Sequence, residues 1–337
     1  MARLNNTTVS NADAITLPRG IGAEKNSVPA SGDLFYNTDV NLVQVAADNK
    51  DGDTIWHSLA KPYTANLIFW YDFGEVTSYG SSGTTVTDLG GNGYDGDIQD
   101  TSEIVFDGAD KYSIAFDTGG DEPADVTSTG IFVSGFHFVN SGATSDSRTS
   151  MSELTIEGWF KCNSANTTNQ NDARIILSYD RSSVFRFGVG VDVIPASAGK
   201  LGFQYYNTTT GLLDTYASNQ TFDLRDDKWH HLAVTLGLQE LTNGSRTLIF
   251  YVDGKTVTYL DETDHSQLAY DCGTSSTETP RYGYIGSGSE ETNSSGAGSA
   301  SPAQMWYGNI GLMRFYEKAL EPGQISKNYH AERQRFV

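Results

Sequence analysis

Short apolar segments recur along most of this 337-residue chain, and within them apolar and polar residues alternate as they do in half-buried strands. The alternation predicts strands near residues 67–73, 112–117, 153–161, 174–180, 184–192, 200–206, 228–236, 247–253, 255–260, 282–286 and 308–316. Turns rich in Gly, Asp and Asn separate these segments. The one helical pattern begins near Glu321 and ends near Arg333. The sequence therefore predicts an all-β fold, with two antiparallel sheets packed as a jelly-roll sandwich.

The charge of the chain argues against two classes of partner. Asp and Glu number 42 against 22 Lys and Arg, which gives a formal charge of −20, and no basic cluster is present. Nucleic acid and anionic lipid attract clustered cations, so we expect neither as a partner. The sequence has neither the apolar core of a signal peptide nor an apolar run of about 18 residues, so we expect no membrane insertion. Cys162 and Cys272 lack the spacing of a metal site, and we expect free, buried thiols.

The first 60 residues differ in pattern from the rest. Residues 1–30 are polar with scattered Pro and Gly, and they predict an extended arm that becomes ordered only against a partner. Residues 31–60 predict a small module of three short strands.

This module resembles one found in tail-fibre, tail-spike and head-fibre proteins of tailed bacteriophages, in which spaced Pro, Gly, aromatic and Asn positions precede a charged Gly turn and a Trp. The matching residues are Pro29, Gly32, Leu34, Tyr36, Asn37, Asn41, Val45 and Trp56. The resemblance implies that Leu34, Tyr36, Asn37 and Trp56 belong to an attachment module that contacts other virion proteins. The alternative is an ordinary small β-meander with the same common turns.

Residues 61–337 carry a second set of motifs in a fixed order. They are the stretch LIFWYDF and the Gly-rich loop after it (67–98), TIEGW (155–159), WHHLAVT (229–235), YVDGK (251–255), YIG (284–286) and the closing segment 308–325. This set resembles the LamG-like jelly roll of the concanavalin A-like lectin/glucanase superfamily. The resemblance implies a two-sheet antiparallel jelly roll that spans residues 61–337.

The Gly-rich loop of residues 87–97 is a candidate calcium site. Calcium prefers carboxylate, amide and carbonyl oxygens at turns, and Asp88 and Asn92 offer such groups. Many members of the superfamily pair the loop Asp with an acidic residue on the last strand, but Gly311 and Leu312 stand there in this chain. Two interpretations stay open: a calcium ion held by Asp88 and Asn92, or the same side chains capping the turn.

Tyrosines near strand ends are the candidate glycan contacts, because a Tyr ring can stack on a sugar while its hydroxyl bonds to the rim. The candidates are Tyr79, Tyr94, Tyr179, Tyr205, Tyr206, Tyr216, Tyr270 and Tyr282, of which Tyr94, Tyr205 and Tyr206 are preferred. Trp159, Trp229, His230 and His231 are expected to pack in the core or on a sheet face.

The carboxylate spacing argues against catalysis. Retaining glycanases need two carboxylates about 5 Å apart on one strand face. The closest spacing, Glu262 and Asp264, falls in a hydrophilic run that predicts a solvated loop, so we expect no catalytic residues.

Together the two resemblances imply a structural protein of a tailed-phage virion, made in the host cytoplasm and placed on the tail or capsid surface. Its residues 1–60 would fasten it to other virion proteins, and its jelly roll would bind a host-surface glycan. A homo-oligomer is expected, with a trimer favoured. Two alternatives stay open: a decoration or joint protein that binds no glycan, and, third, a glycan-degrading enzyme.

Overall fold

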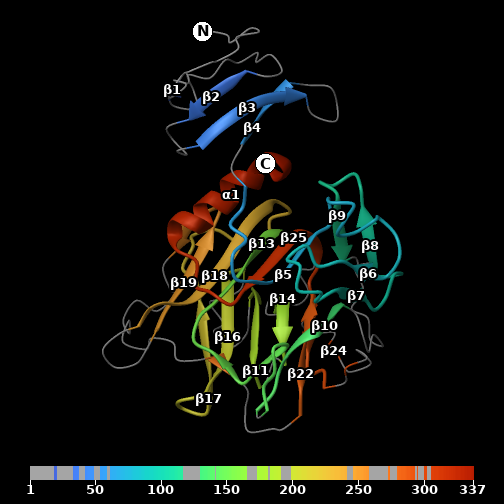
Figure 1. The fold of residues 1–337 in the computed structure, drawn as a ribbon, viewed down its shortest axis with the longest axis vertical. Coiled ribbons are helices and arrows are strands. Elements are labelled where there is room, and N and C mark those ends of the chain that lie inside the picture. Colours follow the sequence, from blue (N-terminus) through green and yellow to red (C-terminus); the bar gives the residue numbers. More distant parts are fainter. Residues whose placement is uncertain are drawn as a thin grey trace. The chain divides into compact units, whose positions relative to one another are not determined.

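The computed structural model describes residues 19–20, 33–37, 42–48, 54–58, 61–116, 130–140, 142–164, 173–180, 183–190, 199–240, 246–257, 272–273, 279–292, 294, 300–301 and 305–337. Most of the expected N-terminal arm, and the run that holds Glu262 and Asp264, lie outside these residues. The chain divides into two compact units (Figure 1). The smaller unit comprises residues 1–63 and 326–337, and the larger comprises residues 64–325.

The smaller unit contains a four-stranded sheet. Its strands are β1 (Arg19–Gly20), β2 (Leu34–Asn37), β3 (Leu42–Asp48) and β4 (Thr54–Ser58), in that spatial order. Strands β2 to β4 form an antiparallel meander, and β1 pairs with β2 in parallel. Leu34 is partly buried, while the side chains of Tyr36, Asn37 and Trp56 lie outside the described part of the structure.

The C-terminal helix α1 (Pro322–Phe336) starts in the larger unit, and its residues from Ser326 onward belong to the smaller one. The helix therefore extends beyond the predicted end near Arg333. Within the smaller unit, the backbone N–H of Tyr63 donates a hydrogen bond of 2.6 Å to the side-chain oxygen of Asn328. No helix in the described residues is both long enough and apolar enough to cross a membrane.

The larger unit contains two main sheets. In the described residues the first sheet has eleven strands: β6 (Thr85–Val86), β7 (Gly96–Ile98), β10 (Ile131–Phe138), β11 (Ser147–Arg148), β12 (Ser150–Met151), β14 (Arg174–Tyr179), β15 (Phe185–Val189), β16 (Leu201–Asn207), β17 (Leu212–Ala217), β21 (Cys272–Gly273) and β22 (Arg281–Ile285). Its main path runs β12-β21-β16-β15-β14-β22-β10-β7-β6, and β17 pairs with β16. Apart from the short parallel pair β10 and β11, its paired strands are antiparallel.

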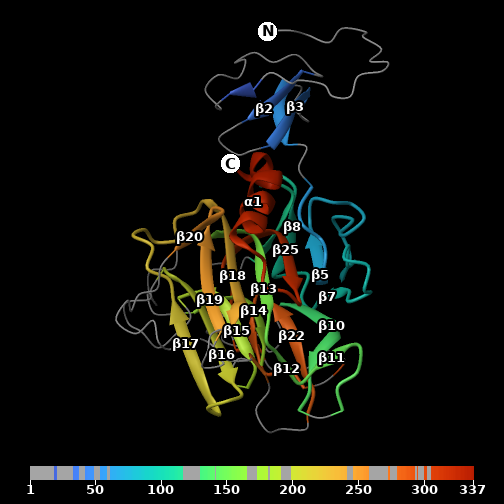
Figure 2. The ribbon, with the colours of Figure 1, turned by 60° about the vertical axis from the view of Figure 1, so that its left-hand side comes forward.

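The second sheet has eight strands in the same described part: β5 (Leu67–Asp72), β8 (Ile104–Asp107), β9 (Ser113–Phe116), β13 (Leu154–Cys162), β18 (Trp229–Glu240), β19 (Arg246–Val252), β20 (Lys255–Val257) and β25 (Gly308–Tyr316). Strands β19, β18 and β13 lie side by side (Figure 2), and β25 follows β13 in the sheet. A short ribbon of β23 (Gly288–Ser289) and β24 (Ala300–Ser301) completes the unit.

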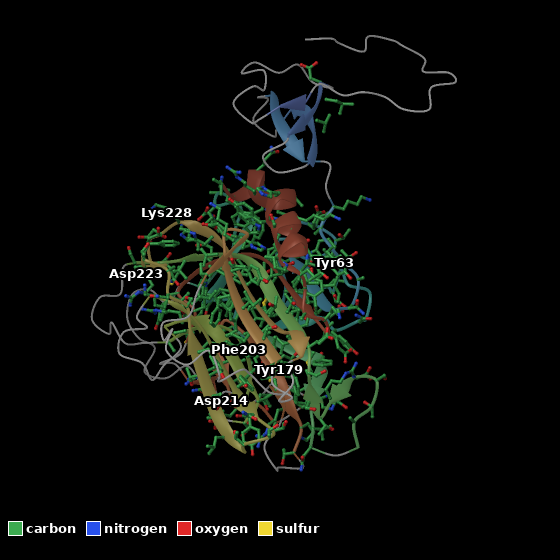
Figure 3. The ribbon with its side chains drawn as sticks, turned by 90° about the vertical axis from the view of Figure 1, so that its left-hand side faces the viewer. Tyr63, Tyr179, Phe203, Asp214, Asp223 and Lys228 are labelled. Carbon is green, nitrogen blue, oxygen red and sulfur yellow. The ribbon has the colours of Figure 1, made fainter. Side chains whose placement is uncertain are left out.

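One hydrophobic core fills the space between the two sheets. Tyr179 and Phe203 of the first sheet point into it (Figure 3), and both are fully buried. Phe315 of β25 meets the ring of Tyr179 at a centroid distance of 6.0 Å, which joins the two sheets directly. The predicted all-β, two-sheet antiparallel sandwich is thus confirmed. Both cysteines are free and buried, as expected, and burial raises the pKa of the Cys162 thiol to about 12.

The face of the second sheet that is turned away from this core carries a buried ionic cluster. Glu157 on β13 lies opposite Arg314 on β25, with Nη1 to Oε1 at 3.4 Å. The hydroxyl of Tyr316 donates to the same carboxylate oxygen at 2.9 Å, and His231 lies 3.4 Å from the other. Burial raises the pKa of Glu157, but these partners outweigh it and the net pKa is lowered, so the group is a buried carboxylate ion.

Candidate functional site

The Gly-rich loop before β7 is organised around the carboxylate of Asp88. Its Oδ1 accepts hydrogen bonds from the backbone N–H groups of Trp70 (2.9 Å) and Gly90 (2.7 Å). Its Oδ2 accepts from the N–H groups of Asn92 (3.1 Å) and Tyr94 (3.4 Å). A carboxylate has about four lone-pair sites, so these four donors occupy the capacity of the group.

Asn92 is engaged in the same way. Its side-chain amide donates to the backbone carbonyls of Leu67 (2.8 Å) and Ile68 (3.0 Å), and so ties the loop to β5. Within the described residues no group of three or more His, Cys, Asp or Glu is placed to hold a metal ion. The hydrogen bonds of Asp88 and Asn92 favour the alternative in which these side chains cap the turn, and calcium binding at this loop stays a prediction.

The preferred tyrosines lie in three different settings. Tyr205 is within β16 and fully buried between Phe203 and Tyr216, so it presents no exposed ring on which a sugar could stack. Tyr206 follows it on the strand and is partly exposed. Tyr94 is also partly exposed, but its ring packs on the core at 5.8 Å from Phe136.

The remaining tyrosines that the structure describes are buried or half-buried. Tyr79, Tyr179 and Tyr282 are buried, Tyr216 is half-buried, and Tyr270 lies outside the described residues. Trp159, Trp229, His230 and His231 are buried, as expected. Among the exposed large apolar residues of the described chain there is one aromatic, Phe222, with 44% of its surface exposed. Phe222 is not among the glycan contacts predicted from the sequence, which are all tyrosines.

Phe222 belongs to residues 219–228, which connect β17 to β18 and which we call the clamped loop. The N–H of Leu224 donates to the carbonyl of Gly199 at 2.9 Å, and the side-chain amide of Gln220 donates to the same carbonyl at 3.1 Å. On the other side, the N–H of Asp227 donates to the carbonyl of Cys162 at 3.1 Å. Two segments that are distant in sequence thus hold the backbone of this loop.

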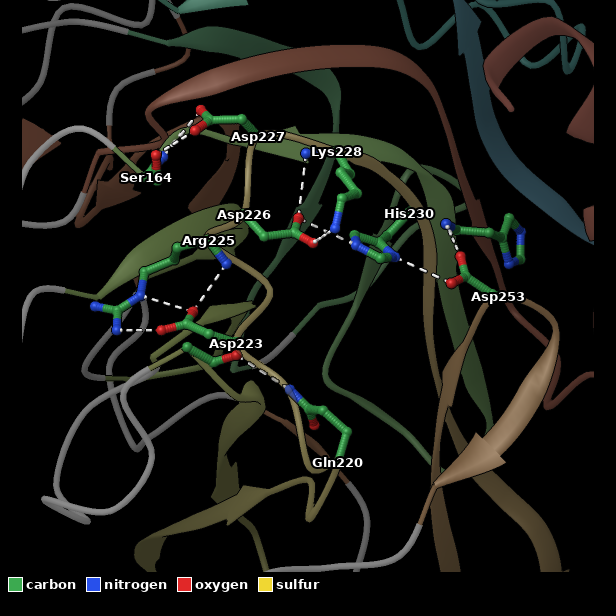
Figure 4. A network of polar contacts seen from close by, with 11 residues as sticks. Ser164, Gln220, Asp223, Arg225, Asp226, Asp227, Lys228, His230 and Asp253 are labelled. Carbon is green, nitrogen blue, oxygen red and sulfur yellow. Dashed lines mark hydrogen bonds and ion pairs between the residues drawn. The ribbon is translucent and has the colours of Figure 1, made fainter.

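Ion pairs within the clamped loop add further restraint (Figure 4). Arg225 donates to Asp223 through Nε (3.0 Å) and Nη2 (2.7 Å), which is a two-bond fork. Lys228 donates through Nζ to Asp226 at 3.0 Å. The Arg225 partner lowers the pKa of Asp223, so this carboxylate stays ionised over the neutral pH range.

His230, the second residue of β18, lies beneath the loop. Its Nδ1 is 3.0 Å from Asp253, and its Nε2 is 3.3 Å from Asp226. Its ring stacks on Phe222, with centroids 5.7 Å apart and planes inclined by 27°. Burial lowers the pKa of His230, but the two carboxylates outweigh burial and the net pKa is raised above its ordinary value. His230 therefore ties the clamped loop to the β19–β20 turn, most strongly when it is protonated.

Trp229, the first residue of β18, is also held by a hydrogen bond. The indole N–H of Trp229 donates to Asp110 at 2.9 Å, and Lys161 bonds the other oxygen of that carboxylate at 2.6 Å. Burial raises the pKa of Asp110, yet these two donors outweigh it and the net pKa is lowered. The result is a rigid sandwich end that presents one exposed aromatic ring.

A family model described as the concanavalin A-like lectin/glucanases superfamily matches residues 139–326, more than half of the chain. The chain belongs to this superfamily. The matched range contains β18, the clamped loop and the buried cluster around Glu157. A search of curated protein sequences finds no significant match.

Several solved structures are similar to this concanavalin A-like chain. One is the binding domain of Paraclostridial Mosquitocidal Protein 1, at 11% identity over 79% of this chain and 52% of that chain, with a TM-score of 0.49. Another is Domain 4 of AbnA, a GH43 extracellular arabinanase from Geobacillus stearothermophilus, in complex with arabinotriose, at 14% identity over 77% and 97%, with a TM-score of 0.45. A third is the Botulinum neurotoxin serotype D binding domain, at 11% identity over 80% and 51%, with a TM-score of 0.44. The chain spans about half the length of the two toxin chains.

The capping role of Asp88 predicts a stability effect that is independent of calcium. Asp88→Ala leaves four backbone N–H groups without their acceptor, and we expect it to lower the free energy of unfolding by about 2 kcal/mol. Chemical denaturation of wild type and variant, each with added calcium and with EDTA, measures this. A calcium-dependent rise in wild-type stability that Asp88→Ala abolishes would contradict the capping interpretation.

The position of His230 predicts a pH-dependent contribution to stability. Because its folded pKa is raised, the contribution is complete below the ordinary pKa of about 6.5 and is lost as pH rises through the raised value. We expect His230→Gln to cost about 2 kcal/mol at acidic pH and less at alkaline pH, as measured by urea denaturation across the range.

His137 is the matched control. Burial lowers its pKa, so the pH dependence of its contribution to stability has the opposite sign to that of His230. His137→Gln should remove a loss of wild-type stability that develops as pH falls. If the cost of His230→Gln is the same at all pH values, His230 is not held as an imidazolium.

Proposed function

We propose that this chain is a structural protein of a tailed-phage virion, and that its concanavalin A-like jelly roll binds glycans on the host surface without cleaving them. The single observation that carries the binding role is the exposed ring of Phe222 on a loop with restraints on every side. Aromatic rings recognise sugars by stacking on their apolar faces. A platform that is already rigid loses little conformational entropy when a ligand binds.

The location of Glu157 supports binding rather than catalysis. This is the carboxylate within the TIEGW motif, and its side chain has no exposed surface. Arg314, Tyr316 and His231 all contact it. A carboxylate with these partners and no access to substrate cannot serve as a glycosidase nucleophile or acid.

The virion role rests on the N-terminal resemblance and on the β2–β4 meander that residues 34–58 form. Residues 1–60 would contact other virion proteins, and the assembled protein would be a closed homo-oligomer, for which we favour a trimer. The protein would then be exposed on the tail or capsid surface, where a glycan-binding unit can reach the host.

The binding role predicts a specific effect of Phe222→Ala. Loss of the ring should weaken binding to host cells and to the best glycan on an array by about tenfold, or about 1.4 kcal/mol. Leu212→Ala is the matched control, because Leu212 is an exposed apolar residue, at 66%, on β17. We expect it to bind as wild type does.

Absence of saturable binding to both cells and glycans would reject the adhesin role and favour the non-binding decoration or joint protein. New reducing ends after incubation with host polysaccharide would instead reveal an enzyme. Both readouts use the full chain, so the attachment module is present in each measurement.

The attachment role predicts that removal of residues 1–60 abolishes incorporation into particles. Circular dichroism of the shortened protein should retain the β signal of the larger unit, because that unit has its own core. Incorporation is measured by complementing a phage that lacks the gene and blotting purified particles. Normal incorporation of the shortened protein would contradict the assignment of the module.

A further inference from the structure

We infer that the clamped loop takes a neutral sugar and discriminates against sugars that carry a carboxylate or phosphate. This inference rests on the proposed glycan-binding function and names the ligand class of that same site. Three features of the loop carry it: the chemistry of its unengaged side chains, the pairing of its cations, and the charge of the unit around it.

The exposed side chains of the loop that take part in no ion pair or hydrogen bond are neutral. Asn219 and Thr221 are exposed, and no interaction engages either side chain in the described structure. The intervening Gln220 is buried and bonded to Gly199. An amide and a hydroxyl can each donate to and accept from sugar hydroxyls. Together with the Phe222 ring they supply stacking and hydrogen bonding without any charge.

The Phe222 ring has an open side for such a ligand. One side of the ring stacks on His230, which is itself 9% exposed, and 44% of the Phe222 surface remains accessible. Because His230 is bonded on both nitrogens, the ring beneath Phe222 is fixed in orientation. A pyranose can therefore stack on the outer side while its hydroxyls reach the neighbouring amide and hydroxyl.

The cations of the loop are already paired with carboxylates of the chain. Arg225 donates two bonds to Asp223, and Lys228 donates to Asp226. His230 lies between Asp226 and Asp253. An acidic sugar would compete with these aspartates for the cations, and so would gain less than it would at an unpaired cation.

The charge of the larger unit acts in the same direction. The smaller unit holds eight Lys and Arg and eight Asp and Glu, so the whole formal charge of −20 belongs to residues 64–325. An anionic ligand approaches this unit against a repulsive field, which salt screens over about 8 Å at physiological strength. A neutral ligand is unaffected.

The test is a titration of the full chain with neutral oligosaccharides and with counterparts that differ by one acidic group, such as a glucose-terminated oligosaccharide and its glucuronic-acid-terminated counterpart. We expect the neutral member of the preferred pair to bind at least about tenfold more tightly. Asp223→Asn removes the carboxylate that offsets the charge of Arg225 and should narrow this affinity ratio. Asp97→Asn is the matched control: it removes the same charge from an exposed position on β7 and should leave the ratio unchanged.

The outcomes separate the two proposals. Tighter or equal binding of the acidic members overturns the inference while the glycan-binding function stands. If Phe222→Ala keeps the full preference for neutral over acidic sugars, the sugar binds elsewhere, and this also overturns the inference. Absence of binding to every member rejects the proposed function itself.

Discussion

The larger unit depends on the contact between its two sheets at Phe315. This ring, on β25, meets Phe136 of β10, Tyr179 of β14 and Phe185 of β15 at centroid distances of 5.9 to 6.0 Å. One side chain thus fixes three strands of the first sheet against the second. Buried aromatic rings contribute large apolar areas and prefer such edge and tilted contacts. Since β25 pairs with β13, and β13 with β18, the contact also sets the position of the strand that follows the clamped loop.

The clamped loop is held on this framework in a defined conformation. Its backbone is bonded to Gly199 and Cys162, its charged side chains bond to one another, and Asp226 also bonds His230 of β18. Each restraint is modest by itself, because an exposed ion pair stabilises by at most about 1 kcal/mol. Together these restraints act mainly by fixing the conformation of the loop, and less by raising the free energy of unfolding. The loop holds Phe222 in one exposed position, and this preorganisation lowers the entropic cost of stacking a ligand on the ring.

The fold could be predicted from the sequence because strand periodicity is local. The same periodicity could have excluded Tyr205 as a glycan contact. Alternate residues of a strand share a face, so Tyr205 faces the core together with Leu201 and Phe203. Asp88 could not be settled in this way. Its carboxylate oxygens are occupied by N–H groups that include Trp70, 18 positions away. The exposure of Phe222 could not be predicted either, because the contacts that hold its loop come from segments distant in the chain.

Stacking on Phe222 also suits the electrostatics of this chain better than ionic recognition would. A site built on free cations in a unit of charge −20 would have its own field neutralised by neighbouring carboxylates. In the clamped loop the cations instead bond to aspartates, so their contribution is to hold the loop in place. In the proposed site, recognition is left to an aromatic ring, an amide and a hydroxyl, whose interactions depend little on ionic strength. The ion pairs therefore keep the loop rigid, and the uncharged groups that the loop exposes form the proposed contact surface.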